Sequence, residues 1–121
     1  MFAVALACQF PLAMTDTGTA DFSTRLEIAQ WTVARGQRAL GQLDEAHAIQ
    51  LALVAETERA GAPDGYVYEE LAEIALARGD TAGAAPWAAK AHALLQNDVY
   101  LAKNEAARLQ RLADIGQGTA K

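Results

Sequence analysis

The chain has 121 residues, close to the size of a single domain, and its ten Lys and Arg against fifteen Asp and Glu give a net charge of −5. Apolar residues make up 52% of the chain, too many for a disordered protein, while 21% is charged, too much for a membrane protein. The negative balance opposes the phosphate contacts that nucleic acids and anionic membranes require, so we expect neither as a partner. A single cysteine, Cys8, excludes an internal disulfide.

Alanine dominates the apolar residues. There are 29 alanines, whereas Leu, Ile, Val and Phe together number 26. Alanine has the highest helix propensity and a small side chain, so helices rich in it can pack closely. The β-branched residues that favour sheets are few. The composition therefore predicts an all-α fold.

The N-terminal segment is strongly apolar. Residues 2–14, FAVALACQFPLAM, are fewer than the roughly 20 that a membrane helix needs, and Gln9 and Pro11 interrupt them. The first basic residue is Arg25, so the basic start of a secretory signal is missing. We expect residues 1–20 to be an apolar segment that ends in a polar linker over 15–20. The segment is interpreted as a short helix or extended piece that packs on the next helix, with a targeting signal as the alternative. We expect a cytoplasmic protein.

Residues 21–121 show a helical pattern with regular stop signals. A first helix is predicted from Asp21 or Ser23 to a turn at Gly41. Its apolar side chains include the spacings of a buried stripe, with the members Leu26, Ile28, Trp31, Val33 and Leu40.

Four further helical regions follow. One begins near residue 43 and ends in ERAGAPDG, and the next is capped by Asp64 and stops at Gly79. Another runs from about 81 to 95 with Pro86 near its first turn, and the last extends from Asp98 to about 115 with a break near Asn104. The residues expected on the apolar faces of the first three of these regions are Ala46, Ile49, Leu53, Val54, Val67, Leu71, Ile74, Ala75, Ala84, Trp87, Ala88, Ala91, Leu94 and Leu95. The apolar residues of the last region are Tyr100, Leu101, Leu109 and Leu112.

The helices form two similar pairs. Laying RALGQLDEA over LARGDTAGA, at an offset of 38 residues, aligns Gly41 with Gly79 and Ala46 with Ala84. Each unit reads as helix, glycine turn, helix. The chain here resembles the tetratricopeptide repeat family, with Tyr68 at its large aromatic position and Ala84 and Ala91 at its two small positions.

This resemblance implies a right-handed superhelix of antiparallel helix pairs. The pairs would span about 23–60 and 65–96, with a capping helix at about 98–115, in one domain over 21–121. In that family the first helix of each pair lines a groove. The groove-facing positions considered as the partner-binding site are Trp31, Arg35, Arg38, Tyr66, Glu69 and Glu73.

Catalytic and metal-binding patterns are sparse. His47 and His92 are 45 residues apart and have no ligand at a metal-binding spacing. Glu69 and Glu73, four residues apart, share a helix face. They could hold a metal or act as an acid and base pair, but a solvated helix face is the simpler interpretation. We therefore expect no enzyme activity, no cofactor and no metal.

We expect a module that binds a protein or peptide through a groove with aromatic, basic and acidic positions, a composition typical of interface hot spots. The family's clamp for an acidic chain terminus uses Lys, Asn and Arg, and the glutamates of the second pair speak against it. The alternatives are a self-associating homodimer, because two helix pairs are few for such a fold, and a small-ligand sensor. Trp31 and Tyr66 could also belong to the core.

Overall fold

The computed structural model describes residues 12–118 of the chain. These residues form six α-helices with no strand among them, so the predicted all-α class is confirmed. The chain divides into two compact units, Met1–Gln30 and Trp31–Lys121. Predictions for residues 1–11, including the packing of the apolar segment and of Cys8, lie outside the described residues. None of the helices within 12–118 combines the length and the apolar character that a membrane crossing needs.

The described part of the first unit, residues 12–30, is helical throughout and forms the start of α2 (Leu12–Ala39). The prediction of a linker over residues 15–20 is therefore wrong. After Pro11 the next proline is Pro63, so no residue of this stretch lacks a backbone donor. Extending an existing helix costs less free energy than starting one, which allows the helix to continue through weak helix formers such as threonine and glycine.

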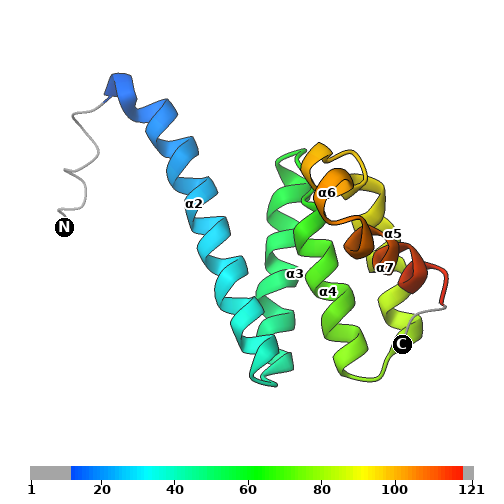
Figure 1. Cartoon of the computed structure of the whole chain (residues 1–121). Coiled ribbons are helices and arrows are strands. Elements are labelled where there is room, and N and C mark those ends of the chain that lie inside the picture. The colour runs from blue at the N-terminus through cyan, green and yellow to red at the C-terminus, as the bar shows by residue number, and fades with distance from the viewer. Residues whose placement is uncertain (1–11, 119–121) are drawn as a thin grey trace. The chain divides into compact units, whose positions relative to one another are not determined.

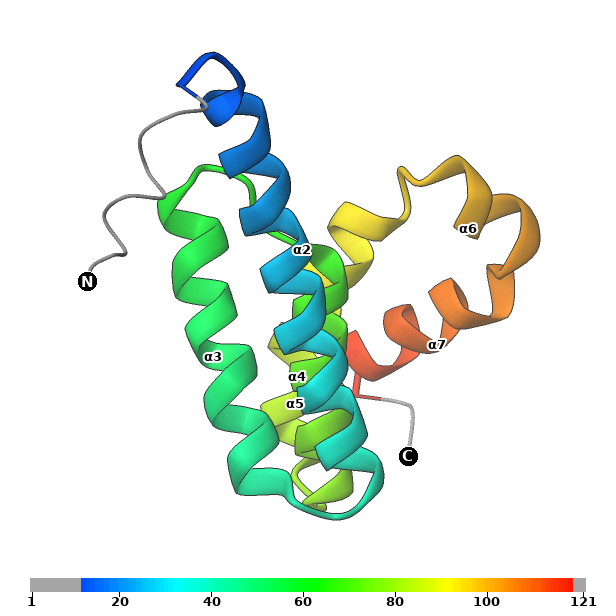
Figure 2. The ribbon, with the colours of Figure 1, turned by 90° about the vertical axis from the view of Figure 1, so that its left-hand side faces the viewer.

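The second unit contains the end of α2 and five more helices. They are α3 (Leu43–Arg59), α4 (Gly65–Ala77), α5 (Thr81–Leu95), α6 (Val99–Asn104) and α7 (Ala106–Gly116). The predicted starts near 43, 65 and 81 and the break near Asn104 are confirmed. Helix α4 lies between α3 and α5 (Figure 1). A view turned by 90° shows α6 and α7 on the opposite side of α4 and α5 from α3 (Figure 2).

Aspartates begin three of these helices. The Asp64 carboxylate accepts a hydrogen bond from the Tyr66 amide at 2.8 Å, as predicted, and so caps α4. Asp80 caps α5 in the same way through Gly83, and Asp98 caps α6 through Leu101. Each carboxylate satisfies a backbone donor that has no partner within its own helix.

The turns after α2 and α4 are alike. Gly41 and Gly79 have φ angles of 82° and 78°, a conformation that costs glycine little and other residues more. The Gln42 amide donates to the Gln37 carbonyl, and 38 residues later the Asp80 amide donates to the Ala75 carbonyl, both at 2.8 Å. The same hydrogen-bonded turn thus ends both helices.

The main core lies where α4 meets α3 and α5. Alanines make the closest contacts, since Ala72 of α4 and three alanines of α5, Ala84, Ala88 and Ala91, are fully buried. Larger side chains fill the space between the helices, and those buried together are Leu53, Val54, Val67, Tyr68, Leu71, Leu95, Leu101, Leu112 and Ile115. Leu94, predicted to face inward, is exposed, as is the apolar Tyr100 of α6, and Leu109 is partly buried.

The predicted buried stripe of α2 is wrong for four of its five members. Val33 is 54% and Leu40 is 76% exposed, and Leu26 and Ile28 are also exposed. Within the second unit, α2 instead buries Ala34, against Ala46 of α3 and Ile74 of α4. Both faces of α2 offer apolar residues, and the face with the small alanine permits the closer approach.

Replacing Ala84 by Leu tests the close helix contacts. The added methylenes have no space, so the change should cost roughly 1–3 kcal/mol of unfolding free energy. The same change at Ala82, which is exposed on the same helix, should cost little. Thermal melting followed by circular dichroism measures both variants. Equal melting temperatures for Ala84→Leu and the parent would contradict the assigned packing.

Replacing Gln50 of α3 is expected to raise the stability of the protein rather than lower it. It is fully buried, and neither its side-chain oxygen nor its nitrogen has a hydrogen-bond partner among the described residues. A buried amide without partners costs about 1–3 kcal/mol, so Gln50→Leu should raise the unfolding free energy by roughly 1 kcal/mol. Urea unfolding measures the change, with the exposed Gln42→Leu as control. A loss of stability would show that the Gln50 amide is satisfied.

Candidate functional site

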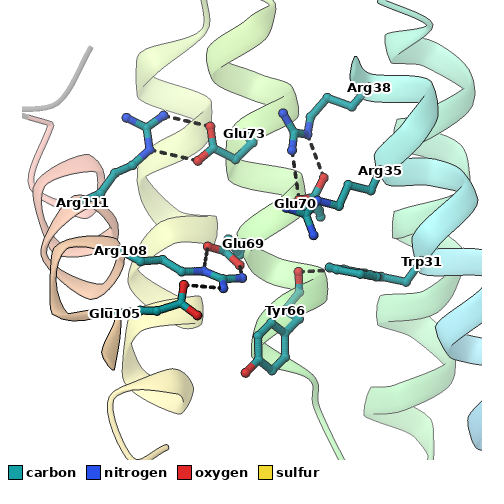
Figure 3. A network of polar contacts seen from close by, with 10 residues as sticks. All are labelled: Trp31, Arg35, Arg38, Tyr66, Glu69, Glu70, Glu73, Glu105, Arg108 and Arg111. Atoms are coloured by element: carbon teal, nitrogen blue, oxygen red, sulfur yellow. Dashed lines mark hydrogen bonds and ion pairs between the residues drawn. The ribbon is translucent and has the colours of Figure 1, made fainter. Parts of the chain in front are cut away.

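Four polar or aromatic residues of α4 lie on one side of the helix in two rows. Tyr66 and Glu70 form one row, and Glu69 and Glu73 form the other, each pair being four residues apart. Glu70 faces the end of α2, whereas Glu69 and Glu73 face α7 (Figure 3). The Tyr66 ring contacts Trp31 of α2 and Arg108 of α7. Helix α4 therefore joins α2 and α7 through its side chains.

On the side of α4 that faces α2, two arginines of α2 interact with one buried carboxylate of α4. Arg38 donates to both oxygens of Glu70, with Nε at 2.7 Å and Nη2 at 3.2 Å. The Nε of Arg35 lies 3.8 Å from the same carboxylate. The Glu70 side chain is only 4% exposed, so this pair is largely shielded from solvent.

On the other side of α4, arginines of α7 pair with carboxylates of α4, and here the arginines follow the glutamates in the chain. Arg108 donates to Glu69 through Nε and Nη2, at 2.8 and 2.6 Å, and through Nη1 to Glu105 at 3.1 Å. Arg111 donates to both oxygens of Glu73, at 3.0 and 2.8 Å. Such two-pronged pairs fix the plane of each guanidinium. We call these eight residues the Arg–Glu network: Arg35, Arg38, Glu69, Glu70, Glu73, Glu105, Arg108 and Arg111.

Two aromatic side chains lie beside the network. The Trp31 indole donates to the Tyr66 carbonyl at 3.2 Å, and the two rings meet edge to face with centroids 6.5 Å apart. The guanidinium of Arg35 lies 5.2 Å from the Trp31 ring centroid, and that of Arg108 lies 5.4 Å from the Tyr66 ring. Both aromatics are half-buried, so they belong to the core edge and to the surface together.

Electrostatics keep the arginines charged. Hydrogen bonds to Glu70 raise the pKa of Arg38, and hydrogen bonds to Glu69 raise the pKa of Arg108 even though burial lowers it. The hydrogen bond with Glu73 has the same effect on the pKa of Arg111. Burial, followed by the charge of Asp98, raises the pKa of the Tyr66 phenol. Arg38, Arg108 and Arg111 therefore keep their positive charges across the pH range in which the protein is handled.

All six residues considered from the sequence, Trp31, Arg35, Arg38, Tyr66, Glu69 and Glu73, come together on this one face. Their charged members are not free, because each pairs with another residue of the chain. The face formed by these six residues together with Glu70, Glu105, Arg108 and Arg111 is called the α2–α4–α7 face below.

Sequence reasoning missed Arg108 and Arg111 as members of the face and gave Glu70 no special role. A signal for Arg111 was present, since the offset of 38 that relates Arg35 to Glu73 also relates Glu73 to Arg111. Applied once more, the repeat offset would have placed α7 as a third helix on this face.

A separate hollow lies at one end of the second unit. Its volume is about 520 Å³, and its lining consists of Ala62, Pro63, Asp64, Gly65, Tyr66, Leu94, Leu95, Asn97 and Asp98. Asp64 and Asp98 each use an oxygen to cap a helix, so the hollow is built around structural carboxylates. Within residues 12–118 there is no group of three or more His, Cys, Asp or Glu arranged to hold a metal ion.

Comparisons with models of protein families, with curated proteins and with solved structures find no match to this chain.

Arg38→Ala tests the stabilising role of the network. It leaves the buried Glu70 carboxylate with only the distant Arg35, and removing one partner of a buried pair costs about 3 kcal/mol. Urea unfolding measures this loss. The matched control is Arg59→Ala, because Arg59 forms an exposed pair with Glu56 on α3 that should contribute less than about 1 kcal/mol. Similar losses for the two variants would contradict the assigned burial.

Proposed function

We propose that this chain is a helical-repeat module of the tetratricopeptide kind that binds a protein or peptide across the α2–α4–α7 face and carries no catalysis, cofactor or metal of its own. The offset of 38 residues supports the repeat. Ala34 and Ala72 are both fully buried, Ala46 and Ala84 are both fully buried, and the turns at Gly41 and Gly79 share their hydrogen bonds.

The binding role is supported by one observation above all, the half-buried Trp31 and Tyr66 held rigid beside arginines. Tryptophan, tyrosine and arginine contribute most of the binding energy in protein interfaces. Here their conformations are already fixed by hydrogen bonds and stacking, so a partner would order few side chains on binding. A face of this kind suits recognition better than chemistry, because it offers no acid and base with separated roles.

Arg35→Ala is the sharpest test of this face. Arg35 is 54% exposed and only weakly engaged with Glu70, so its removal should leave the fold intact. Capture of the native partner from lysate should weaken about tenfold, roughly 1.4 kcal/mol, because a hot-spot arginine is lost. Circular dichroism accompanies each pull-down. Trp31→Ala is a poorer probe, since the loss of its hydrogen bond and packing would destabilise the protein.

The control for this experiment is Arg59→Ala, which removes an exposed arginine from α3, outside the face. Unchanged capture by Arg35→Ala, with Arg59→Ala also unchanged, would contradict the proposed binding face.

A second candidate function is self-association. Val33 and Leu40 expose apolar side chains at the end of α2, and a second copy could cover them. Size-exclusion chromatography with light scattering distinguishes a homodimer from a monomer that binds another protein.

A further inference from the structure

The Arg–Glu network contains equal numbers of arginines and glutamates, but the positive and negative charges are distributed unequally between its two ends. At the α2 side, Glu70 is shared by Arg38 and Arg35, two positive charges on one carboxylate. At the α7 side, Arg108 is shared by Glu69 and Glu105, two carboxylates on one positive charge. Arg111 and Glu73 pair one to one. The face therefore has a positive end at α2 and a negative end at α7.

The surplus charges are accessible. The side chains of Glu70 and Glu69 are 4% and 9% exposed, so these two carboxylates lie underneath, whereas Arg111 is 45% exposed with its charge paired to Glu73. Arg35 is 54% exposed and Glu105 is 38% exposed. A partner that lies on this face would meet Arg35 at one end and Glu105 at the other.

Both groups retain hydrogen-bonding capacity. The Arg35 guanidinium contacts Glu70 at 3.8 Å and stacks over Trp31, but it donates no hydrogen bond to any residue in the described part of the second unit. Glu105 accepts from Arg108 through Oε1, which leaves Oε2 for another donor. Glu105 also precedes α7 without its side chain capping the helix. Neither Arg35 nor Glu105 therefore uses all of its hydrogen-bonding capacity within the second unit.

The separation of the two ends can be estimated from helix spacing. Helix α7 packs on α5 and meets α4 through Arg–Glu pairs. Directly packed helices have axes about 8–10 Å apart, so two steps of at least that size, from α2 to α4 and from α4 to α7, span roughly 16–20 Å. An extended chain advances about 3.3 Å per residue, so about five or six residues bridge that span. Between the two ends lie the Tyr66 ring and the carbon atoms of the paired side chains.

We propose that the α2–α4–α7 face binds an extended protein segment that carries an acidic and a basic residue about five or six positions apart, the acidic residue on Arg35 and the basic residue on Glu105. This inference rests on the proposed function and adds the chemistry of the partner. A uniformly acidic segment would meet Glu105 and a chain of net charge −5, and a uniformly basic segment would meet Arg35.

Selection from a library of random twelve-residue peptides displayed on phage tests the proposal. The parent protein should enrich peptides with one acidic and one basic residue at that spacing. Glu105→Arg makes both ends positive and should shift the selection to peptides with two acidic residues. Arg35→Glu makes both ends negative and should shift it to peptides with two basic residues. The preferred synthetic peptide should bind about tenfold more tightly than its uncharged counterpart.

Lys103→Glu is the matched control, because Lys103 is exposed on α6 and takes no part in the network, so the selection should stay unchanged. Circular dichroism of every variant verifies folding. No enrichment by the parent, or the same peptides from all variants, would overturn the charge pattern. If the pattern fails while Arg35→Ala still weakens capture of the native partner, the proposed function stands and only this inference is lost.

Discussion

The second unit depends on the neutralisation of carboxylates on one helix. Glu69 and Glu70 of α4 are nearly buried, and a buried carboxylate without a counter-ion is very costly. Arginines from α2 and α7 provide the counter-ions from opposite sides. Because α4 also packs against α3 and α5, a single helix contacts elements from both ends of the unit. The placement of α2 and α7 is therefore linked to the charge requirements of α4.

The alanine-rich composition makes this arrangement feasible. Ala72, Ala84, Ala88 and Ala91 allow helices to approach closely, and the large side chains fill the remaining core. Ala34 of α2 is likewise fully buried with Ile74 of α4, and one turn later Arg38 reaches the Glu70 carboxylate with two nitrogen donors. The small core residues that the composition provides thus allow close helix packing, and this packing brings the charged side chains within hydrogen-bonding distance of one another.

The same contacts underlie the proposed binding face. Hydrogen bonds that stabilise the unit also fix the guanidinium planes, and the Trp31 indole is fixed by its bond to the Tyr66 carbonyl. The Glu70 carboxylate is buried, whereas Arg35 and Glu105 are exposed. The surface therefore presents a pattern of charge that the net charge of the network does not reveal. Stability and binding would then depend on different residues of one network, with Arg38 contributing to stability and Arg35 to binding.

The sequence by itself determined the starts of α3, α4 and α5, because these depend on local signals, and it pointed to six of the ten residues on the α2–α4–α7 face. Asp64 and the glycines at 41 and 79 act within a few residues, and the repeat offset brought the six site residues to one face. Only the tertiary structure decided which face of α2 is buried and which arginine meets which glutamate. Ala34 is buried with Ala46 and Ile74, 12 and 40 positions away, and the Arg–Glu hydrogen bonds between helices join residues 32 to 39 positions apart. Neither periodicity nor spacing within one helix encodes the partner on another.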